Sequence, residues 1–434
     1  MGGITMIYNE KFNYDFTEIS DELAVKEASG ECEQSELLIA EGCSYSRNCY
    51  VTKLNNNVIV VGGSGTGKTR TIVTPNMLQG AGSQIICAPK GGFCQKYGEK
   101  LRKNGYRVIY LDFTHPEKSL HYNPLVKIKS TQDILRITDI IVNEKASYGS
   151  RTDPFWDAMT TIFISALIAY MIETDYKPLN FSGILKLIRE GERDDDDTKN
   201  SPLSKRFEEL KNKNPNSWAC QQFEEVNQSP YKTYDTIRAT VAAKFAKLDT
   251  EELRTMMGGN DIDFIRIAKE KTTVFVTVSD TDRSMDILAN IFFTHAMQAL
   301  CEFADNECDN GRLPIPVNFI LDDFATNCRI DEFPRMISSI RSRGISVMLL
   351  IQSEAQLKQS YGFDSKTIIS NCDTYVYLGG NDIETARSVG LRCDKPLKAI
   401  LNMPVGNCWV FRRGEAPVFT KLLNPTEYLQ DQER

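Results

Sequence analysis

The sequence predicts an α/β fold in which a mainly parallel sheet is interrupted by an inserted all-α domain. Residues 58–125 and 272–389 alternate short apolar runs with helix-length segments, which is typical of βαβ units. Residues 130–258 instead carry helical periodicity without a convincing strand pattern. A glycine-rich turn at 62–69 follows one of the first strands and is typical of a phosphate-binding loop.

Short apolar runs bounded by polar or glycine-rich stretches predict the strands. They cover residues 36–40, 58–61, 84–88, 107–111, 272–278, 317–321, 346–351 and 374–378. Helices are expected around the sheet at 69–79, 93–104, 285–303, 332–342, 354–360 and 382–389. In the middle region they are expected at 131–144, 154–173, 181–189, 203–213, 217–228 and 231–248. The pattern divides the chain into an N-terminal extension (1–50), a nucleotide-binding domain (51–130 and 262–434) and an inserted all-α domain (131–261).

Composition is that of an ordinary soluble globular protein, with 41% hydrophobic and 25% charged residues. A net charge of -7 argues against a globally basic nucleic-acid-binding protein and leaves a local basic channel open. The twelve cysteines are scattered without a CxxC pair, so we interpret them as free thiols in a reducing cytoplasm.

The most apolar stretch, 159–171, is too short for a span of about 18 residues and predicts a buried core helix. Four aspartates at 194–197 predict a solvated turn, with a metal or partner site as the alternative.

The glycine-rich turn fits the pattern G-x-x-x-x-G-K-[ST]. Its glycines permit positive φ, so that backbone N–H groups can wrap phosphates. Lys68 is expected to reach the β- and γ-phosphates, and the Thr69 hydroxyl is expected to hold Mg²⁺. The predicted nucleotide-binding residues are Gly62, Gly63, Ser64, Gly65, Thr66, Gly67, Lys68 and Thr69.

An apolar strand that ends in Asp322 and Asp323 has the Walker B pattern. Carboxyl ends of parallel strands meet at one edge of a sheet, so both acids are expected beside Lys68 and Thr69. We assign Asp322 to the Mg²⁺ shell and Asp323 to polarisation of water. The alternative is an ordinary strand exit with solvated acids.

Two further features follow the Walker B strand. Gln352 ends the next strand, and its amide suits a sensor of the γ-phosphate or a group that orients water. Arg341 and Arg343 lie between the two strands. They are either surface cations or a source of an arginine finger that reaches the nucleotide of a neighbouring subunit.

A set of motifs runs in order from about residue 54 to 390: GGSGTGKTR, TPN, APKGGF, YNPL, DPFW, FILDDFA, IRSRGIS, LLIQSEAQL and SNCDTYVYLGG. In these motifs the chain resembles the type IV coupling proteins, with members from Gram-positive conjugative elements most similar. These ATPases hand DNA–protein substrates to a type IV secretion channel in conjugation.

The resemblance implies a RecA-like motor domain with an inserted all-α domain, and a homohexameric ring with ATP and Mg²⁺ at its subunit interfaces. It implies that Asp322 binds the metal and that Asp323 polarises water. It also implies that Arg341 is the arginine finger and that Gln352 is the sensor of the γ-phosphate. It also implies DNA in a central channel, relaxase or other cargo on the all-α domain, and components of the secretion channel as partners. The expected location is cytoplasmic, at the inner face of the bacterial cell membrane.

The chain departs from the family pattern at three places. Asp323 stands where the family usually has Glu, and the shorter side chain is expected to position water less well. Residues 88–92 read APKGG and lack both acids of the usual motif. The N-terminal membrane helices of most members are not seen in this sequence. This predicts either a soluble fragment or a chain that relies on a membrane partner. A monomer in isolation is then the alternative to the ring.

Residues 151–260 contain 15 Lys or Arg and 18 Asp or Glu, which favours a surface for protein cargo, or a structural lid, over a DNA clamp. We therefore predict an ATP-driven coupling protein that recruits a DNA–relaxase substrate and moves DNA. The alternative is a nucleotide-binding docking receptor with little motor activity. A small-molecule kinase is disfavoured because the Walker B strand lies some 250 residues from Lys68.

Overall fold

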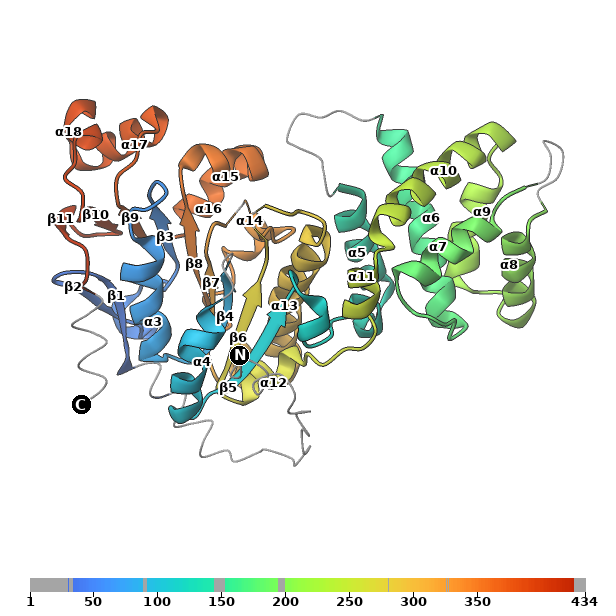
Figure 1. Cartoon of the computed structure of the whole chain (residues 1–434), viewed down its shortest axis with the longest axis horizontal. Coiled ribbons are helices and arrows are strands. Elements are labelled where there is room, and N and C mark those ends of the chain that lie inside the picture. The colour runs from blue at the N-terminus through green and yellow to red at the C-terminus, as the bar shows by residue number, and fades with distance from the viewer. Residues whose placement is uncertain are drawn as a thin grey trace, which may run out of the picture. The chain divides into compact units, whose positions relative to one another are not determined.

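The computed structural model describes residues 34–88, 92–143, 153–193, 200–279, 281–324 and 328–424, together with Gly30 and Thr326. The chain forms two compact units (Figure 1). The first contains Met1–Thr114, Asp263–Asp280 and Ala296–Arg434, and the second contains His115–Ile262 and Thr281–His295. The predicted insertion, 131–261, lies inside the second unit, which also takes in residues on either side of it. The division into functional domains stays a prediction.

A nine-stranded sheet forms the centre of the first unit, with strand order β11-β10-β9-β3-β8-β7-β4-β6-β5. The strands are β3 (Val58–Val61), β4 (Ser83–Ala88), β5 (Arg107–Asp112), β6 (Thr272–Thr277), β7 (Val317–Leu321), β8 (Ile345–Ile351), β9 (Thr374–Tyr377), β10 (Asn407–Arg412) and β11 (Val418–Lys421). Neighbours from β9 to β5 pair in parallel, and β10 and β11 add an antiparallel hairpin at one edge. The predicted mainly parallel sheet is confirmed.

Both faces of the central strands are buried, as expected for a parallel sheet covered on each side. All four residues of β3 are fully buried. On one face, Val58 and Val60 join a core cluster with Ile72, Met77 and Leu101 from the adjoining helices. A short antiparallel hairpin, β1 (Glu36–Ala40) with β2 (Cys43–Ser46), packs into the same cluster. This packing fixes the strand that leads into the phosphate loop.

The remaining helices of the first unit are mostly short. Apart from the short 3-10 helices η4 (Asp309–Gly311) and η5 (Gly362–Asp364), they are α2 (Cys49–Thr52), the π-helix η1 (Thr69–Val73), α3 (Thr74–Gln79), α4 (Phe93–Lys103), α12 (Phe264–Lys269), α14 (Phe333–Met336), α15 (Glu354–Tyr361), α16 (Ser365–Ser370), α17 (Ile383–Cys393) and α18 (Leu397–Leu401). Helix α13 (Asp286–Glu307) begins in the second unit and ends in the first.

The described part of the second unit is helical, as predicted. Its helices are α5 (Thr131–Asn143), α6 (Pro154–Glu173), α7 (Phe181–Glu190), α8 (Pro202–Lys213), α9 (Trp218–Asn227), α10 (Tyr231–Leu248), α11 (Glu251–Met256) and the start of α13. Side chains of Asp153, Asn180 and Ser201 accept backbone N–H bonds at the starts of α6, α7 and α8, as N-cap residues do. Helix α6 packs against α5, α9 and α10 and supplies much of the core.

Two helices, α6 and α13, are long and apolar enough to cross a membrane by length and composition alone. More than half of the most apolar window of each is buried inside the fold. Core helices of folded domains pass the same test, so the two helices are weak evidence of a membrane span.

The helix predicted at 332–342 is wrong beyond its first turn. Helix α14 ends at Met336, and turns follow up to β8. The hydroxyls of Ser338, Ser339 and Ser342 each donate to a carbonyl three residues earlier. Such local bonds compete with the α-helical ladder, and serine is a weak helix former. The helix predicted at 69–79 is present, but its first turn is π-helical.

Candidate nucleotide-binding site

The predicted phosphate loop connects β3 to η1 and is fastened to two neighbouring strands. The Gly62 N–H donates to the Ile351 carbonyl at 3.1 Å, and the Gly63 N–H donates to the Gly379 carbonyl at 3.0 Å. Gly65 and Gly67 adopt φ of +76° and +93°, which side-chain-bearing residues rarely take. The loop therefore needs glycine for its backbone path.

Gly62 is required for a different reason, which is space. A Cβ at this position would lie 2.7 Å from Thr66 Oγ1 and 3.0 Å from Leu378 Cβ. The Thr66 hydroxyl donates to the Gly63 carbonyl at 2.8 Å, so its rotamer is already set by the loop. A side chain at Gly62 would displace this threonine and the packing against β9.

Lys68 is almost fully buried beneath the loop. Its Nζ donates to the Gly62 carbonyl at 2.6 Å and to the Gly63 carbonyl at 3.2 Å. Burial lowers the pKa of Lys68, while the carboxylates of Asp323 and Asp322 act to raise it. The ammonium is thus held by neutral carbonyls beside two acids, within the loop that is expected to take the phosphates.

Thr69 and Asp322 are brought together although 253 positions separate them. The Thr69 hydroxyl donates to Asp322 Oδ2 at 2.5 Å, and the Asp323 N–H donates to Asp322 Oδ1 at 3.1 Å. Burial raises the pKa of Asp322, the Thr69 hydrogen bond lowers it, and the charge of Asp323 raises it further. A hydroxyl and a carboxylate are hard oxygen donors, so this pair fits Mg²⁺ next to phosphate.

Asp323 and Gln352 lie at the carboxyl ends of adjacent strands, β7 and β8. Gln352 Nε2 donates to Asp323 Oδ1 at 3.5 Å. Asp323 has a positive φ of 50°, and strained backbone of this kind is concentrated at functional sites. The following residue anchors the turn, since the Phe324 N–H donates to the Leu350 carbonyl at 2.8 Å. A carboxylate and an amide at this edge can orient a water molecule.

Arg341 is not brought to the phosphate loop of its own chain. Arg341 precedes β8 in the chain, whereas Gln352 follows β8. The seven residues of this strand span roughly 20 Å, so the two residues lie at opposite ends of it. The Arg341 guanidinium is exposed and donates to the Cys49 carbonyl at 2.9 Å. Arg343, by contrast, is bound bidentately to Asp305, with both N–O distances at 2.7 Å. Of the two arginines, Arg341 is the one left available to another molecule.

Several features of the site were not predicted from the sequence. They include the Gly379 carbonyl that fixes the loop, the π-helical turn of η1, and the Cys87 carbonyl that accepts the Asp322 N–H at 3.2 Å. The Gly379–Gly380 pair at the end of β9 was a usable signal, because paired glycines after a strand often mark a close backbone approach. Residues 89–91 of the APKGG stretch and the aspartates at 194–197 lie outside the described residues.

Comparison with known proteins finds one family. Residues 17–393 match the profile described as type IV secretory system conjugative DNA transfer. The conjugal transfer protein TraG of Agrobacterium fabrum is 22% identical over 355 residues, which cover 77% of this chain and 50% of TraG. The TraG of Rhizobium radiobacter is also 22% identical over 355 residues, which cover 52% of that protein. The chain therefore spans about half the length of the curated relatives it matches.

Solved structures match over nearly the whole chain. The unbound bacterial conjugative coupling protein TrwBdeltaN70 has a TM-score of 0.65 at 15% identity, covering 94% of this chain and 92% of that one. The plasmid coupling protein TrwB with the non-hydrolysable ATP analogue ADPNP has a TM-score of 0.65 at 16% identity, covering 94% and 93%. VirB4 of Thermoanaerobacter pseudethanolicus has a TM-score of 0.53 at 12% identity, covering 92% and 98%. At these identities the likeness shows the fold, a RecA-like nucleotide-binding architecture.

Proposed function

This chain belongs to the type IV secretory system conjugative DNA transfer family, and we propose that it is an ATP-dependent coupling protein. In this role it recruits a DNA–relaxase substrate to the secretion channel and drives DNA translocation by hydrolysing ATP. The observation that carries the proposal is the 2.5 Å contact between the Thr69 hydroxyl and the Asp322 carboxylate, beside the buried ammonium of Lys68. This pairing joins the two halves of a nucleoside triphosphate site.

Each residue of the site has a part in the proposed hydrolysis. Lys68 and the loop N–H groups bind the β- and γ-phosphates, while Thr69 and Asp322 hold Mg²⁺. Bound Mg²⁺ would neutralise charge that builds up between these phosphates. Asp323 and Gln352 orient a water whose oxygen forms a bond to the γ-phosphorus as the bond to ADP breaks. Asp323 takes up the proton that this water releases.

We assign Arg341 to the nucleotide of a neighbouring chain. It stands at the end of β8 opposite to Gln352, so it cannot serve its own loop without unfolding the strand. A head-to-tail contact, in which the amino edge of one sheet faces the carboxyl edge of the next, closes into a ring when its rotation closes. We propose a homohexamer of this kind, with DNA in the central channel.

The remaining partners follow from the same proposal. The all-α domain at 131–261 is the proposed surface for relaxase or other protein cargo. Components of the secretion channel are the proposed partners at the inner face of the bacterial cell membrane, where the chain would act in the cytoplasm. A docking receptor with little turnover is the second candidate, and the short Asp323 side chain favours it.

The experiment that tests this proposal mixes two inactive variants. Lys68→Ala lacks phosphate binding, and Arg341→Ala lacks the group offered to a neighbour. In rings formed at random from equal amounts of the two variants, an intact loop from the Arg341→Ala chain meets an intact arginine from the Lys68→Ala chain at about one quarter of the interfaces. ATP turnover should therefore reappear on mixing, to roughly that fraction of the unmodified chain.

Arg343→Ala is the matched control, because this arginine is committed to Asp305 and should keep most of the turnover. Turnover that stays absent in every mixture would contradict shared sites. Normal turnover of Arg341→Ala alone would remove the finger assignment and leave the phosphate loop untouched.

A further inference from the structure

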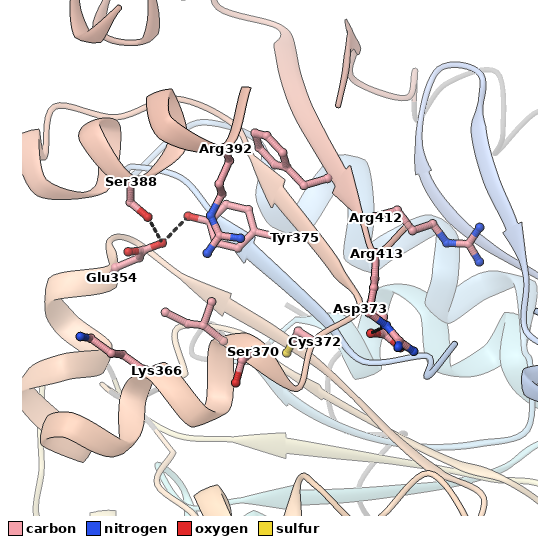
Figure 2. A pocket seen from close by; sticks show the side chains of 12 residues that line it. Glu354, Lys366, Ser370, Cys372, Asp373, Tyr375, Ser388, Arg392, Arg412 and Arg413 are labelled. Carbon is pink, nitrogen blue, oxygen red and sulfur yellow. Dashed lines mark hydrogen bonds and ion pairs between the residues drawn. The ribbon is translucent and has the colours of Figure 1, made fainter. Parts of the chain in front are cut away.

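A pocket of about 490 Å³ lies in the first unit near the edge of the sheet (Figure 2). It is bordered by α15, α16 and α17, by the start of β9 and by the end of β10. The phosphate loop lies at the other end of β9, where the Leu378 N–H donates to the Val61 carbonyl. The pocket is therefore separate from the nucleotide-binding site described above, and its size suits a small ligand.

The pocket is cationic, although the whole chain carries a net charge of -7. Four basic side chains and two carboxylates line it. Both carboxylates are held within the protein. Asp373 is bound bidentately by Arg413, at 2.5 and 3.1 Å. Glu354 Oε1 accepts from the Tyr375 hydroxyl at 2.8 Å and from Ser388 at 3.3 Å.

Two cations of the pocket, Arg392 and Lys366, remain available. Both are exposed, and no carboxylate in the described part of the chain forms an ion pair with either of them. The Arg392 guanidinium lies over the Tyr375 ring, 4.4 Å from its centroid (Figure 2). Stacking uses the flat face of a guanidinium and leaves the N–H donors at its rim free for an oxygen ligand. Because the Tyr375 hydroxyl donates a hydrogen bond to Glu354, the position of the Tyr375 ring is fixed before a ligand binds.

An aromatic surface continues from the pocket to the last strand of the sheet. Phe411 pairs with Tyr375 across β9 and β10, with ring centroids 5.8 Å apart. Trp409 stacks on Phe411 at 6.1 Å and contacts Phe419 of β11 at 5.0 Å. Phe419 is 46% exposed. Aromatic rings beside unpaired cations are the combination that holds bases and phosphates of single-stranded nucleic acid.

We propose that this pocket binds a nucleotide unit outside the phosphate loop. The phosphate meets Arg392 and Lys366. The base lies against the partly exposed ring of Trp409 and the exposed ring of Phe419, which the buried Phe411 connects to the pocket. Either a free nucleotide or one unit of a single-stranded DNA carries this chemistry. The proposal stands on its own residues and does not require ATP turnover.

The test uses the full chain with Lys68→Ala, so that nucleotide binding at the phosphate loop is removed. Anisotropy of a fluorescent oligodeoxythymidine measures binding over a series of salt concentrations. The pocket variant is Arg392→Gln with Lys366→Gln. The matched control is Arg387→Gln with Lys358→Gln, two exposed residues on α17 and α15 that do not line the pocket and carry the same charge change.

We expect the pocket variant to bind the oligonucleotide about tenfold more weakly. The slope of log K against log salt is negative, and its magnitude should decrease by about 0.7 for each phosphate that the variant no longer neutralises. The control variant should bind as the parent does. Thymidine monophosphate, added as a competitor, distinguishes the sources. Competition assigns the site to free nucleotides as well as to single strands, and no competition assigns it to single strands.

Equal weakening in the pocket and control variants would overturn the proposal, because it would show general electrostatic attraction. An unchanged affinity in the pocket variant, or no binding of either ligand by the parent, would also overturn it. These outcomes are distinct from a failure of the coupling-protein proposal, which is tested by turnover and not by binding to a Lys68→Ala chain.

Discussion

His295 gives the second unit a pH-dependent stability that can be calculated. Its Nδ1 lies 3.0 Å from the hydroxyl of Tyr122, a fully buried residue. Burial lowers the pKa of His295 to about 4, the charge of Asp133 acts to raise it, and that of Arg136 acts to lower it. The neutral imidazole is therefore favoured in the folded protein.

The sign follows from proton binding in the two states. An unfolded histidine has a pKa near 6.5, so between about pH 6.5 and pH 4 the unfolded chain takes up a proton that the folded chain does not. The free energy of unfolding therefore falls as the pH falls through this window. The pKa difference of about 2.5 corresponds to about 3 kcal/mol in full, and about 2 kcal/mol is lost between pH 7.5 and pH 5. Because His295 keeps some exposure, these are upper values.

The assay is urea denaturation at pH 7.5 and pH 5, followed by tryptophan fluorescence, to which Trp156 and Trp218 contribute from the same unit. His295→Gln is the comparison, since glutamine can still bond to the Tyr122 hydroxyl but does not titrate. The unmodified chain should lose up to about 2 kcal/mol more than the variant between the two pH values. The same loss in both chains would refute the reasoning, because carboxylates would then account for the whole effect.

Three further predictions concern the nucleotide-binding site. Gly62→Ala should lower the free energy of unfolding by about 1–3 kcal/mol through overpacking. Gly63→Ala should lower it less, because a Cβ there meets only ordinary contacts at 3.9 Å. Equal losses for the two variants in urea titrations would contradict this reasoning. Thr69→Val should remove most of the Mg²⁺-dependent gain in binding of a fluorescent ATP analogue, so a gain that persists would argue against the metal assignment. Asp323→Glu should keep or raise turnover while Asp323→Ala abolishes it, and undiminished turnover of the alanine variant would exclude the role in water activation.

The fold was largely predictable because its signals are local. Apolar runs ending in glycine or acidic residues marked the strands of the parallel sheet, and helical periodicity marked α6 and α10. The same local reasoning failed at 332–342, where serine hydroxyls compete for the backbone. It also omitted the hairpin of β10 and β11, although the apolar run at 408–411 and the turn residues Gly414 and Pro417 are strand and turn signals.

The site was predictable only in part. The pairing of Thr69 with Asp322 follows from strand order, because carboxyl ends of parallel strands share an edge. Strand order also explains why Arg341 stands at the opposite edge, although the sequence alone left its role open. The Gly379 carbonyl and the pocket at Arg392 depend on packing between distant segments, and no local pattern in the sequence encodes them.

The most direct test of the account is steady-state ATP turnover of the purified chain, over a range of protein concentrations, with and without single-stranded and double-stranded DNA. Lys68→Ala serves as the blank. The account predicts turnover that rises with protein concentration and with DNA, because active sites form between chains. Binding of ATP without turnover under every condition would contradict a motor and leave a docking receptor as the better description.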